Sequence, residues 1–196
     1  PLEIGSVGGG TGMIAYDFKG GSASASRVVK AAGESFTVGV FVQANFGTRP
    51  ELVVAGVPIG RHIKGNEIRS TPGGSIIAMI ATDAPLMPHQ CKRLARRVGM
   101  GIARGGTISH NGSGDIFLAF STANKNAWDV DSGANDCRFL PNHTMDPLFK
   151  GVVEATEEAI VDSMVANETM IGRDGTTVIA LPHDRLQELL RQHGRL

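Results

Sequence analysis

The sequence changes abruptly at Ser75, and this change constrains the fold more than any other feature. Residues 60–74 are polar and end in the Gly73-Gly74 pair, which is typical of a surface loop. The run SIIAMIATDAPL, residues 75–86, then begins with a nearly continuous apolar stretch. Such a stretch predicts a strand that is buried on both faces. A loop must therefore lead the chain directly into the interior of a sheet at Ser75.

Apolar periodicity predicts the remaining secondary structure. Strands are predicted where apolar and β-branched residues run together, at residues 36–44, 52–57, 115–122 and 176–181. Helices are predicted from Pro88 to about Arg104, from a cap at Thr144 or Asp146, and over residues 184–192. A hairpin turn is expected at residues 47–50, and residues 5–26 lack periodicity until residues 13–18. This order predicts one domain, residues 1–196, with a layer of helices packed on a sheet.

Charge and composition argue against several functional classes. Lys plus Arg and Asp plus Glu are equal at 19 each, so the net charge of zero gives no support for a nucleic-acid partner or a charged membrane surface. No apolar run is long enough to span a bilayer. No histidine sits at helical i, i+4 spacing with another ligand, and Cys91 and Cys137 match no zinc pattern. We expect no metal, cofactor, nucleic acid or membrane, and favour the cytoplasm over the periplasm.

Cleavage of the peptide bond before Ser75 would make this position a self-contained nucleophile. The strand would then begin with a free α-amine, whose reference pKa of about 7.7–8.0 lets it take the hydroxyl proton near neutral pH. Gly74 has no Cβ, so it permits the strained backbone that attack of Ser75 on the Gly74 carbonyl needs. On its own, however, a Gly-Ser pair at the start of a strand is more typical of an ordinary turn.

Two further polar segments offer groups that suit such chemistry. Ser113 and Asp115 alternate at the entry to a strand, so both project to one face, where the carboxylate can hold the hydroxyl as a proton relay. Asn45 ends a strand, where its amide can donate to a developing oxyanion. Residue types alone favour turns at both places. For His110, near Ser113 in the chain, a Ser–His pair and a plain loop histidine remain open alternatives.

The glycine-rich segment GSVGGGTGM, residues 5–13, does not match a phosphate-binding loop. That loop requires Lys followed by Ser or Thr after its second glycine, whereas Met13 and Ile14 follow Gly12. No strand is predicted before the segment, and no acidic residue follows at the spacing of a dinucleotide-binding motif. We therefore expect close approach of the backbone to another chain segment rather than a nucleotide site.

Several long sequence blocks carry a family resemblance. They are GSVGGGTGM, VGVFVQANFG, RPELVVAGVPIG, GGSIIAMIATDAPLMPHQCKRLARR, NGSGDIFLAFSTAN and GRDGTTVIALP. In this order, over nearly the whole chain, they resemble the DmpA-like aminopeptidases, which include L-aminopeptidase/D-esterases and β-peptidyl aminopeptidases. The resemblance implies an α+β fold, a four-layer αββα sandwich similar to the N-terminal-nucleophile hydrolases and to ornithine acetyltransferases.

The resemblance also implies roles for the candidate residues. Self-cleavage between Gly74 and Ser75 would make Ser75 the nucleophile with its own amine as base. Ser113 and Asp115 would assist, and the Asn45 amide would stabilise the oxyanion. Some members have Glu at the acidic position. The side chain of Asp115 is one methylene shorter, so its carboxylate would reach less far.

The implied products are residues 1–74, the end of an α chain, and residues 75–196, a β chain. Together they would release N-terminal residues from short peptides, amides or esters, and members of the family are commonly homo-oligomers.

One departure from the family pattern concerns the start of the chain. Family members have a substantial segment before the glycine-rich block, with an acidic residue and a tyrosine that recognise the substrate amine, whereas this chain starts at Pro1. We expect a missing N-terminal segment or chain, and apolar surface exposed without it. Two alternatives are an acyltransferase of the ornithine acetyltransferase type, which is expected to use Thr as its new N-terminus, and a catalytically silent member.

Overall fold

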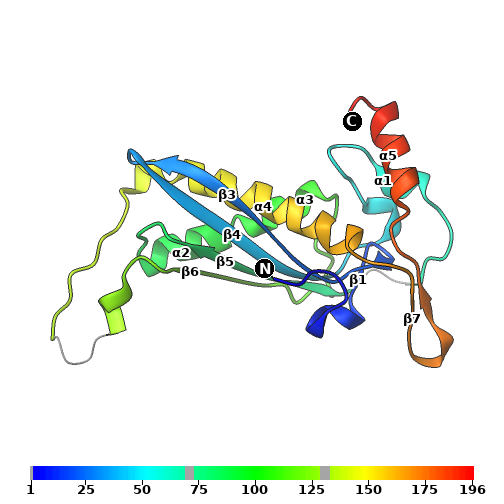
Figure 1. The fold of residues 1–196 in the computed structure, drawn as a ribbon, viewed down its shortest axis with the longest axis horizontal. Coiled ribbons are helices and arrows are strands. Elements are labelled where there is room, and N and C mark those ends of the chain that lie inside the picture. The colour runs from blue at the N-terminus through cyan, green and yellow to red at the C-terminus, as the bar shows by residue number, and fades with distance from the viewer. Residues whose placement is uncertain (1, 69–72, 129–132) are drawn as a thin grey trace.

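A four-stranded sheet forms the centre of the structure, a computed structural model that describes residues 2–68, 73–128 and 133–196 (Figure 1). The strands stand in the order β3, β4, β5, β6, with bounds Ser22–Ala31, Glu34–Asn45, Ser75–Thr82 and Ile116–Ser121. β3 and β4 form an antiparallel hairpin, β5 pairs antiparallel with β4, and β6 pairs parallel with β5. The predicted strands at residues 36–44 and 115–122, and the strand that begins at Ser75, are confirmed.

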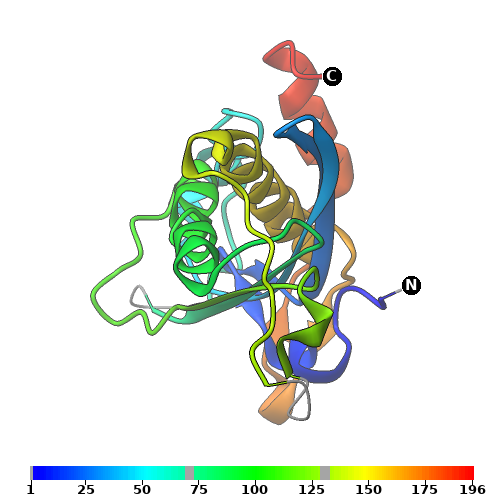
Figure 2. The same cartoon turned by 90° about the vertical axis from the view of Figure 1, so that its left-hand side faces the viewer.

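Helices α2 (Pro88–Ala95), α3 (Val98–Arg104) and α4 (Asp146–Val165) cover one face of this sheet (Figures 1 and 2). α4 packs along β3 and β4, and α2 packs against β5 and β6. The other short elements are η1 (Gly8–Gly12), β1 (Ile14–Ala15), β2 (Phe18–Lys19), η2 (Arg49–Glu51), α1 (Ile59–His62), η3 (Lys125–Trp128), η4 (Asn142–Thr144), β7 (Met170–Ile171), η5 (Arg173–Gly175), β8 (Thr177–Val178) and α5 (His183–Gln192). Within the described part of the chain, no helix has the length and apolar character to cross a membrane.

The hydrophobic core lies between the sheet and these helices. Alternate residues of the strands point into it, among them Val38, Val40 and Val42 of β4 and Ile76, Ala78 and Ile80 of β5. One face of α4 meets them, with Leu148, Val152, Ala155, Ala159 and Ile160 all buried. Each large apolar side chain buried in this way contributes roughly 1.5–3 kcal/mol, so this interface holds the helical layer on the sheet.

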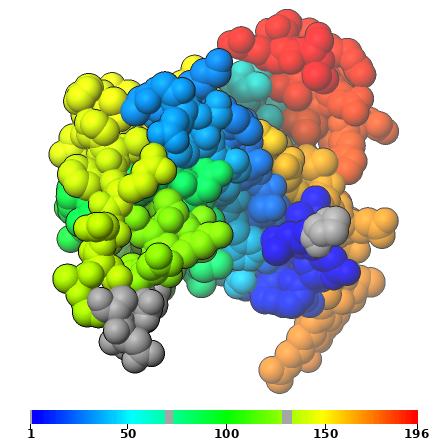
Figure 3. Space-filling view, turned by 60° about the vertical axis from the view of Figure 1, so that its left-hand side comes forward, coloured from blue at the N-terminus to red at the C-terminus, as the bar shows by residue number. Residues whose placement is uncertain are grey.

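The opposite face of the sheet is open, which corrects the prediction that the strand from Ser75 is buried on both faces. Ile77 and Met79 of β5 are 42% and 39% exposed, and Ile116, Leu118 and Phe120 of β6 are 60%, 54% and 45% exposed. In Figure 3 the segments that contain the strands, coloured from blue to lime, reach the surface on the side that faces the viewer. The apolar run therefore reflects a face that nothing in the described chain covers.

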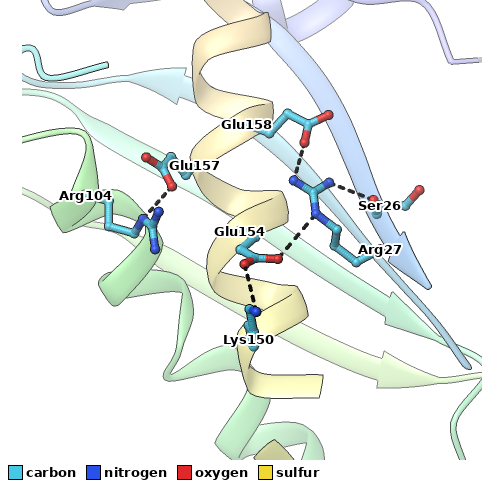
Figure 4. Close-up of polar contacts among 7 residues, drawn as sticks. All are labelled: Ser26, Arg27, Arg104, Lys150, Glu154, Glu157 and Glu158. Atoms are coloured by element: carbon cyan, nitrogen blue, oxygen red, sulfur yellow. Dashed lines mark hydrogen bonds and ion pairs between the residues drawn. The ribbon is translucent and has the colours of Figure 1, made fainter. Parts of the chain in front are cut away.

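Ion pairs tie α4 to its neighbours at the rim of the core (Figure 4). Arg27 of β3 reaches Glu158 and, at 3.6 Å, Glu154. Arg104 of α3 pairs with Glu157 at 2.5 Å. Because all these side chains remain partly exposed, each pair adds little stability and mainly orients the helix.

The glycine-rich segment packs tightly against neighbouring backbone, as expected. A Cβ added to Gly10 would lie 2.4 Å from the Gly5 carbonyl oxygen, and one added to Gly9 would lie 2.5 Å from Oε1 of Gln43. The buried Lys19 fixes the segment in place, because its ammonium donates hydrogen bonds to the carbonyls of Gly10, Met13 and Gly20. Burial lowers the pKa of Lys19. These glycines therefore permit close packing of the chain.

Two predictions about strands were wrong. Residues 22–31, in which no strand was predicted, form β3, because pairing with β4 along its whole length organises a Ser- and Ala-rich segment. Residues 52–57 form no strand, since Ala55 and Gly56 have positive φ and turn the chain back so that Val54 and Val57 pair with each other. The hairpin turn expected at residues 47–50 is wrong as well, because no strand follows it: these residues lead into η2, where Thr48 and Glu51 form a capping box.

Two predictions about helices also need correction. The helix from Pro88 to about Arg104 is divided into α2 and α3, and Gly101 lets α3 approach α4 so closely that a Cβ there would lie 2.6 Å from Thr156. Neither Thr144 nor Asp146 caps α4: its N-cap is Met145, without a side-chain hydrogen bond. The Thr144 hydroxyl instead donates to the Pro141 carbonyl. The terminal helix is confirmed as α5, whereas the predicted strand at residues 176–181 shortens to β8.

Candidate active site

Asn45 and Ser75 mark the end of the sheet at which the candidate residues gather. Asn45 is the last residue of β4, Ser75 is the first residue of β5, and the two are direct partners in the antiparallel ladder. Residues 75, 77 and 79 share a face of the strand because side chains alternate. Ile77 and Met79 are exposed, so the Ser75 side chain lies on the open face of the sheet.

The segment that precedes β6 brings Ser113 and Asp115 beside Ser75. The backbone N–H of Gly114 donates to Oγ of Ser75 at 2.8 Å. The Asp115 carboxylate accepts from the Ile76 backbone N–H at 3.0 Å and from the Ser113 hydroxyl at 2.5 Å. The alternation at the entry to β6 thus places the serine and the carboxylate together, and the parallel pairing of β5 with β6 sets them against the start of β5.

The amide of Asn45 is held in one orientation. Its Oδ1 accepts the backbone N–H of Ile14 at 3.1 Å. An amide whose oxygen is held in this way presents its NH₂ group on the opposite side. The side chain is therefore fixed as a donor next to the β4–β5 ladder.

The backbone at Gly74 has a conformation that favours glycine. Its φ is +93°, in the left-handed region that side chains rarely adopt. Beside it lies a cavity of about 10 Å³, lined in part by Gly73, Gly74, His110, Ser113 and Asp115. The bond expected to be cut therefore borders a space of about the size of one water molecule.

His110 does not form the Ser–His pair that was one alternative. Its Nε2 lies 2.8 Å from Oε1 of Glu51, although not in the direction of a hydrogen bond. The Ser113 hydroxyl donates to Asp115, and the Ser113 N–H donates to the His110 carbonyl at 2.8 Å. The histidine thus supports the turn that carries Ser113, while its ring faces a different carboxylate.

A much larger cavity, of about 650 Å³, lies between α2 and β6 and contains none of these groups. Its lining is mostly apolar and includes Leu86, Phe117 and Phe120 together with both cysteines. Both cysteines are free, Cys91 buried and Cys137 exposed. Size alone would select this cavity, but the candidate nucleophile, carboxylate and amide that the sequence singled out meet at Ser75.

Comparison with known proteins shows the family of this chain. The model for peptidase family S58 matches residues 1–178. The chain belongs to peptidase family S58. The β-peptidyl aminopeptidase BapA of Sphingosinicella microcystinivorans is 46% identical over 211 residues, which cover 100% of this chain and 53% of the relative.

Solved structures of similar proteins confirm the fold. The L-aminopeptidase D-Ala-esterase/amidase of Ochrobactrum anthropi, described as a variant of the Ntn hydrolase fold, is 48% identical with a TM-score of 0.90 over 100% of this chain and 54% of its own. A β-aminopeptidase of Burkholderia sp. is 44% identical with a TM-score of 0.85, over 99% of this chain and 55% of its own. The predicted family and the α+β fold of the N-terminal-nucleophile type are thus confirmed. The S58 chain described here spans about half the length of these relatives and supplies one sheet and one helical layer.

Sequence reasoning missed three polar groups around the S58 site. Ser109 donates to the second Asp115 oxygen at 3.2 Å, the Gly114 N–H binds Ser75, and Glu51 faces His110. Gly114 lies within the Asn-Gly-Ser-Gly-Asp motif of residues 111–115, and Ser109 lies two residues before it, so the motif could have pointed to both residues. Glu51 lies far away in sequence and had no such signal.

Proposed function

We propose that this chain is the C-terminal part of an autoprocessed serine aminopeptidase. It would form one domain, residues 1–196, that cuts itself between Gly74 and Ser75 into residues 1–74 and 75–196. The observation that carries this proposal is the position of Ser75. It is the first residue of a strand, it follows a glycine with left-handed φ, and it lies opposite Asn45.

The proposed mechanism assigns each group one task. After the cut, the α-amine of Ser75 takes the proton of its own hydroxyl, and Oγ attacks the substrate carbonyl. The scissile bond then breaks, the amine or alcohol leaves with that proton, and the acyl group stays on Oγ as an acyl-enzyme. The Asn45 NH₂ donates to the oxyanion. Ser113, held by Asp115, passes a proton near the amine. Water then releases the acyl group as a free acid.

The proposed substrates are short peptides, amides or esters that lose one N-terminal residue at a time. The names of the relatives, β-peptidyl aminopeptidase and L-aminopeptidase D-Ala-esterase/amidase, support this class for the chain. Ser75 stands where the acyltransferase alternative is expected to have Thr, and the relatives named above are aminopeptidases. The joint presence of Ser75, Ser113, Asp115 and Asn45 argues against a silent member.

The open sheet face supports a missing N-terminal segment or chain as partner. The Ser75 side chain lies on the same face as the exposed Ile77 and Met79. Apolar patches of this kind mark interaction surfaces. The partner would cover this face, close the substrate site and supply the groups that recognise the substrate amine, and the completed enzyme would be a homo-oligomer. Two free thiols favour the cytoplasm.

The test is the intact mass of the full-length product. A fragment that begins at Ser75 is expected, and none after Ser75→Ala, while the control Ser35→Ala, at an exposed position near the start of β4, should still be cut. Peptidase activity should rise with pH through the ordinary range of an α-amine, about 7.7–8.0. An uncut chain with full activity would overturn the proposal.

A further inference from the structure

Lys19 is a buried cation that donates three hydrogen bonds to the backbone. Its side chain is 1% exposed, and its ammonium donates to the carbonyls of Gly10 at 3.3 Å, Met13 at 2.8 Å and Gly20 at 2.5 Å. Three acceptors match the three N–H groups of an ammonium, whereas a neutral amine would have only two N–H groups to offer. The geometry therefore fits the charged form, and hydrogen bonds to neutral carbonyls do not cancel its charge.

One of these carbonyls belongs to the peptide group that also holds Asn45. The peptide between Met13 and Ile14 is trans, so its C=O and its N–H point in opposite directions. Its C=O accepts from Lys19 at 2.8 Å, and its N–H donates to Oδ1 of Asn45 at 3.1 Å. The ammonium of Lys19 and the amide of Asn45 are thus bound to the two ends of the same peptide group.

The hydrogen bonds run in one direction, from the charge to the candidate oxyanion donor. A cation on the carbonyl oxygen of Met13 draws electron density from the peptide, which makes the N–H of Ile14 a stronger donor. The stronger bond to Oδ1 polarises the Asn45 amide in the same sense, because bonds in such a chain reinforce one another. Each link therefore makes the NH₂ group of Asn45 a better donor to negative charge.

The same contacts fix the position of this peptide group. The Met13 carbonyl also accepts the backbone N–H of Gly20 at 3.0 Å, so both of its lone pairs are used. Ile14 stands opposite Lys19 in the β1–β2 pair, which places the ammonium beside the peptide that it binds. An oxyanion site is effective when its donors are in place before charge develops on the substrate. A peptide held at both ends meets this requirement for Asn45.

We propose that Lys19 is a positioning residue of the oxyanion site, which fixes and polarises the Asn45 amide through the Met13–Ile14 peptide. This inference rests on the proposed function, in which Asn45 donates to the oxyanion. The three N–H groups of Lys19 are all bound within the protein, so Lys19 acts through Asn45 and not on the substrate directly. Because negative charge develops next to Asn45 only in the transition state, Lys19 should affect kcat rather than KM.

The experiment measures nitroaniline release from an amino-acid nitroanilide by the cut, full-length protein. Lys19→Met removes the charge and keeps a side chain of similar length. It should lower kcat by roughly tenfold, less than the two to three orders of magnitude expected when the whole donor is lost, and should change KM by less than about twofold. The matched control is Lys150→Met, at an exposed position on α4, which should keep full activity.

A double-mutant cycle with Asn45→Ala separates positioning from a merely structural role. In the Asn45→Ala background, Lys19→Met should lower kcat by less than about twofold, because the group through which Lys19 acts is gone. A structural lysine would lower kcat by the same factor with and without Asn45, and this additive result would overturn the proposal. A kcat of Lys19→Met within about twofold of the unmodified enzyme would overturn it as well.

A second variant covers the case in which Lys19→Met does not fold or is not cut, as judged by circular dichroism and intact mass. Lys19→Gln keeps two N–H donors without the charge, and it then takes the same place in the cycle. If this variant also gives no folded, cut enzyme, Lys19 serves folding and the proposal is rejected.

The outcomes distinguish this inference from the proposed function. An unmodified full-length protein that is not cut before Ser75 and releases no nitroaniline would refute the proposed function and this inference with it. A cut and active enzyme in which the effects of Lys19→Met and Asn45→Ala simply add would refute the role of Lys19 alone.

Discussion

Asn45 and Ser75 are direct partners across the β4–β5 ladder, at the end where the chain leaves one strand and returns into the other. Residues paired in this way point to the same face, with Cβ atoms roughly 5 Å apart. The candidate nucleophile and the candidate oxyanion donor are therefore held by the same backbone hydrogen bonds. A ladder at the centre of a four-stranded sheet holds them more firmly than a loop would.

Replacement of Asn45 by Asp should separate catalysis from structure. Asp keeps an oxygen that can accept the Ile14 N–H, but it loses the NH₂ donor. We expect the rate of amide hydrolysis to fall by roughly two to three orders of magnitude, while the melting temperature changes little. Nitroaniline release from an amino-acid nitroanilide measures the rate. Asn126→Ala, at an exposed position in η3, is the control. A loss smaller than about fivefold would assign Asn45 to structure.

Ser113 and Asp115 should behave as one unit. Ser113→Ala removes the hydroxyl that donates to Asp115, and Asp115→Asn keeps an acceptor for the Ile76 N–H but removes the charge. We expect each change to lower the rate by about a hundredfold and the double change to cost little more, because both act on one relay. Ser109→Ala, which loses the bond to the other Asp115 oxygen, is the matched control and should have a much smaller effect. Additive losses would argue for two independent roles.

Local pattern was enough to predict where β5 begins, but residue types alone favoured ordinary turns at the polar residues gathered there, and the family resemblance singled them out. Ser75, Ser113 and Asn45 all lie at the end of an apolar run, and such ends meet at one edge of a sheet. β3 was missed because Ser and Ala carry no apolar alternation, so its conformation depends on pairing with β4. The false strand at residues 52–57 failed because positive φ at Ala55 and Gly56 reverses the chain.

Contacts between distant segments could not be predicted from the sequence. Glu51 and His110 meet only because η2 and the segment before β6 pack together. The open face of β5 was also missed, since an apolar run looks the same whether this chain or another segment covers it.

Gly74→Ala should slow self-cleavage. A side chain at a φ of +93° costs about 1–2 kcal/mol, which corresponds to roughly five- to thirtyfold in rate if the loop relaxes away from the strained geometry. Gly73→Ala is the matched control, because among the described residues an added Cβ there would meet no atom within 4 Å. The uncut fraction of each variant after a fixed time, measured by intact mass, compares their rates of self-cleavage. Equal cutting by both variants would show that strain at Gly74 plays no part.

A charge placed on the open sheet face should reveal whether another layer covers it in the whole protein. Leu118 is 54% exposed in this chain. If a partner segment covers β6, Leu118→Glu buries an unpaired charge and lowers the free energy of unfolding of the full-length protein by about 3 kcal/mol or more. Ile171→Glu, at an exposed apolar position on β7, is the control and should change it by no more than about 0.5 kcal/mol. If urea unfolding shows that Leu118→Glu and Ile171→Glu change the free energy of unfolding by the same amount, the sheet face stays open in the whole protein.

Asp162 on α4 should make stability depend on pH. Burial, and to a smaller extent the charge of Glu158, raises the pKa of Asp162 in the folded state. The folded protein then holds this proton more tightly than the unfolded chain does, so ionisation costs stability above the raised pKa and costs nothing below the ordinary value of about 3.9. Asp162→Asn should therefore raise the melting temperature at pH 7, and the gain should vanish towards pH 3. Asp136→Asn, in an exposed loop, is the control for the substitution itself. A gain that is the same at both pH values would mean that the effect comes from packing rather than from ionisation.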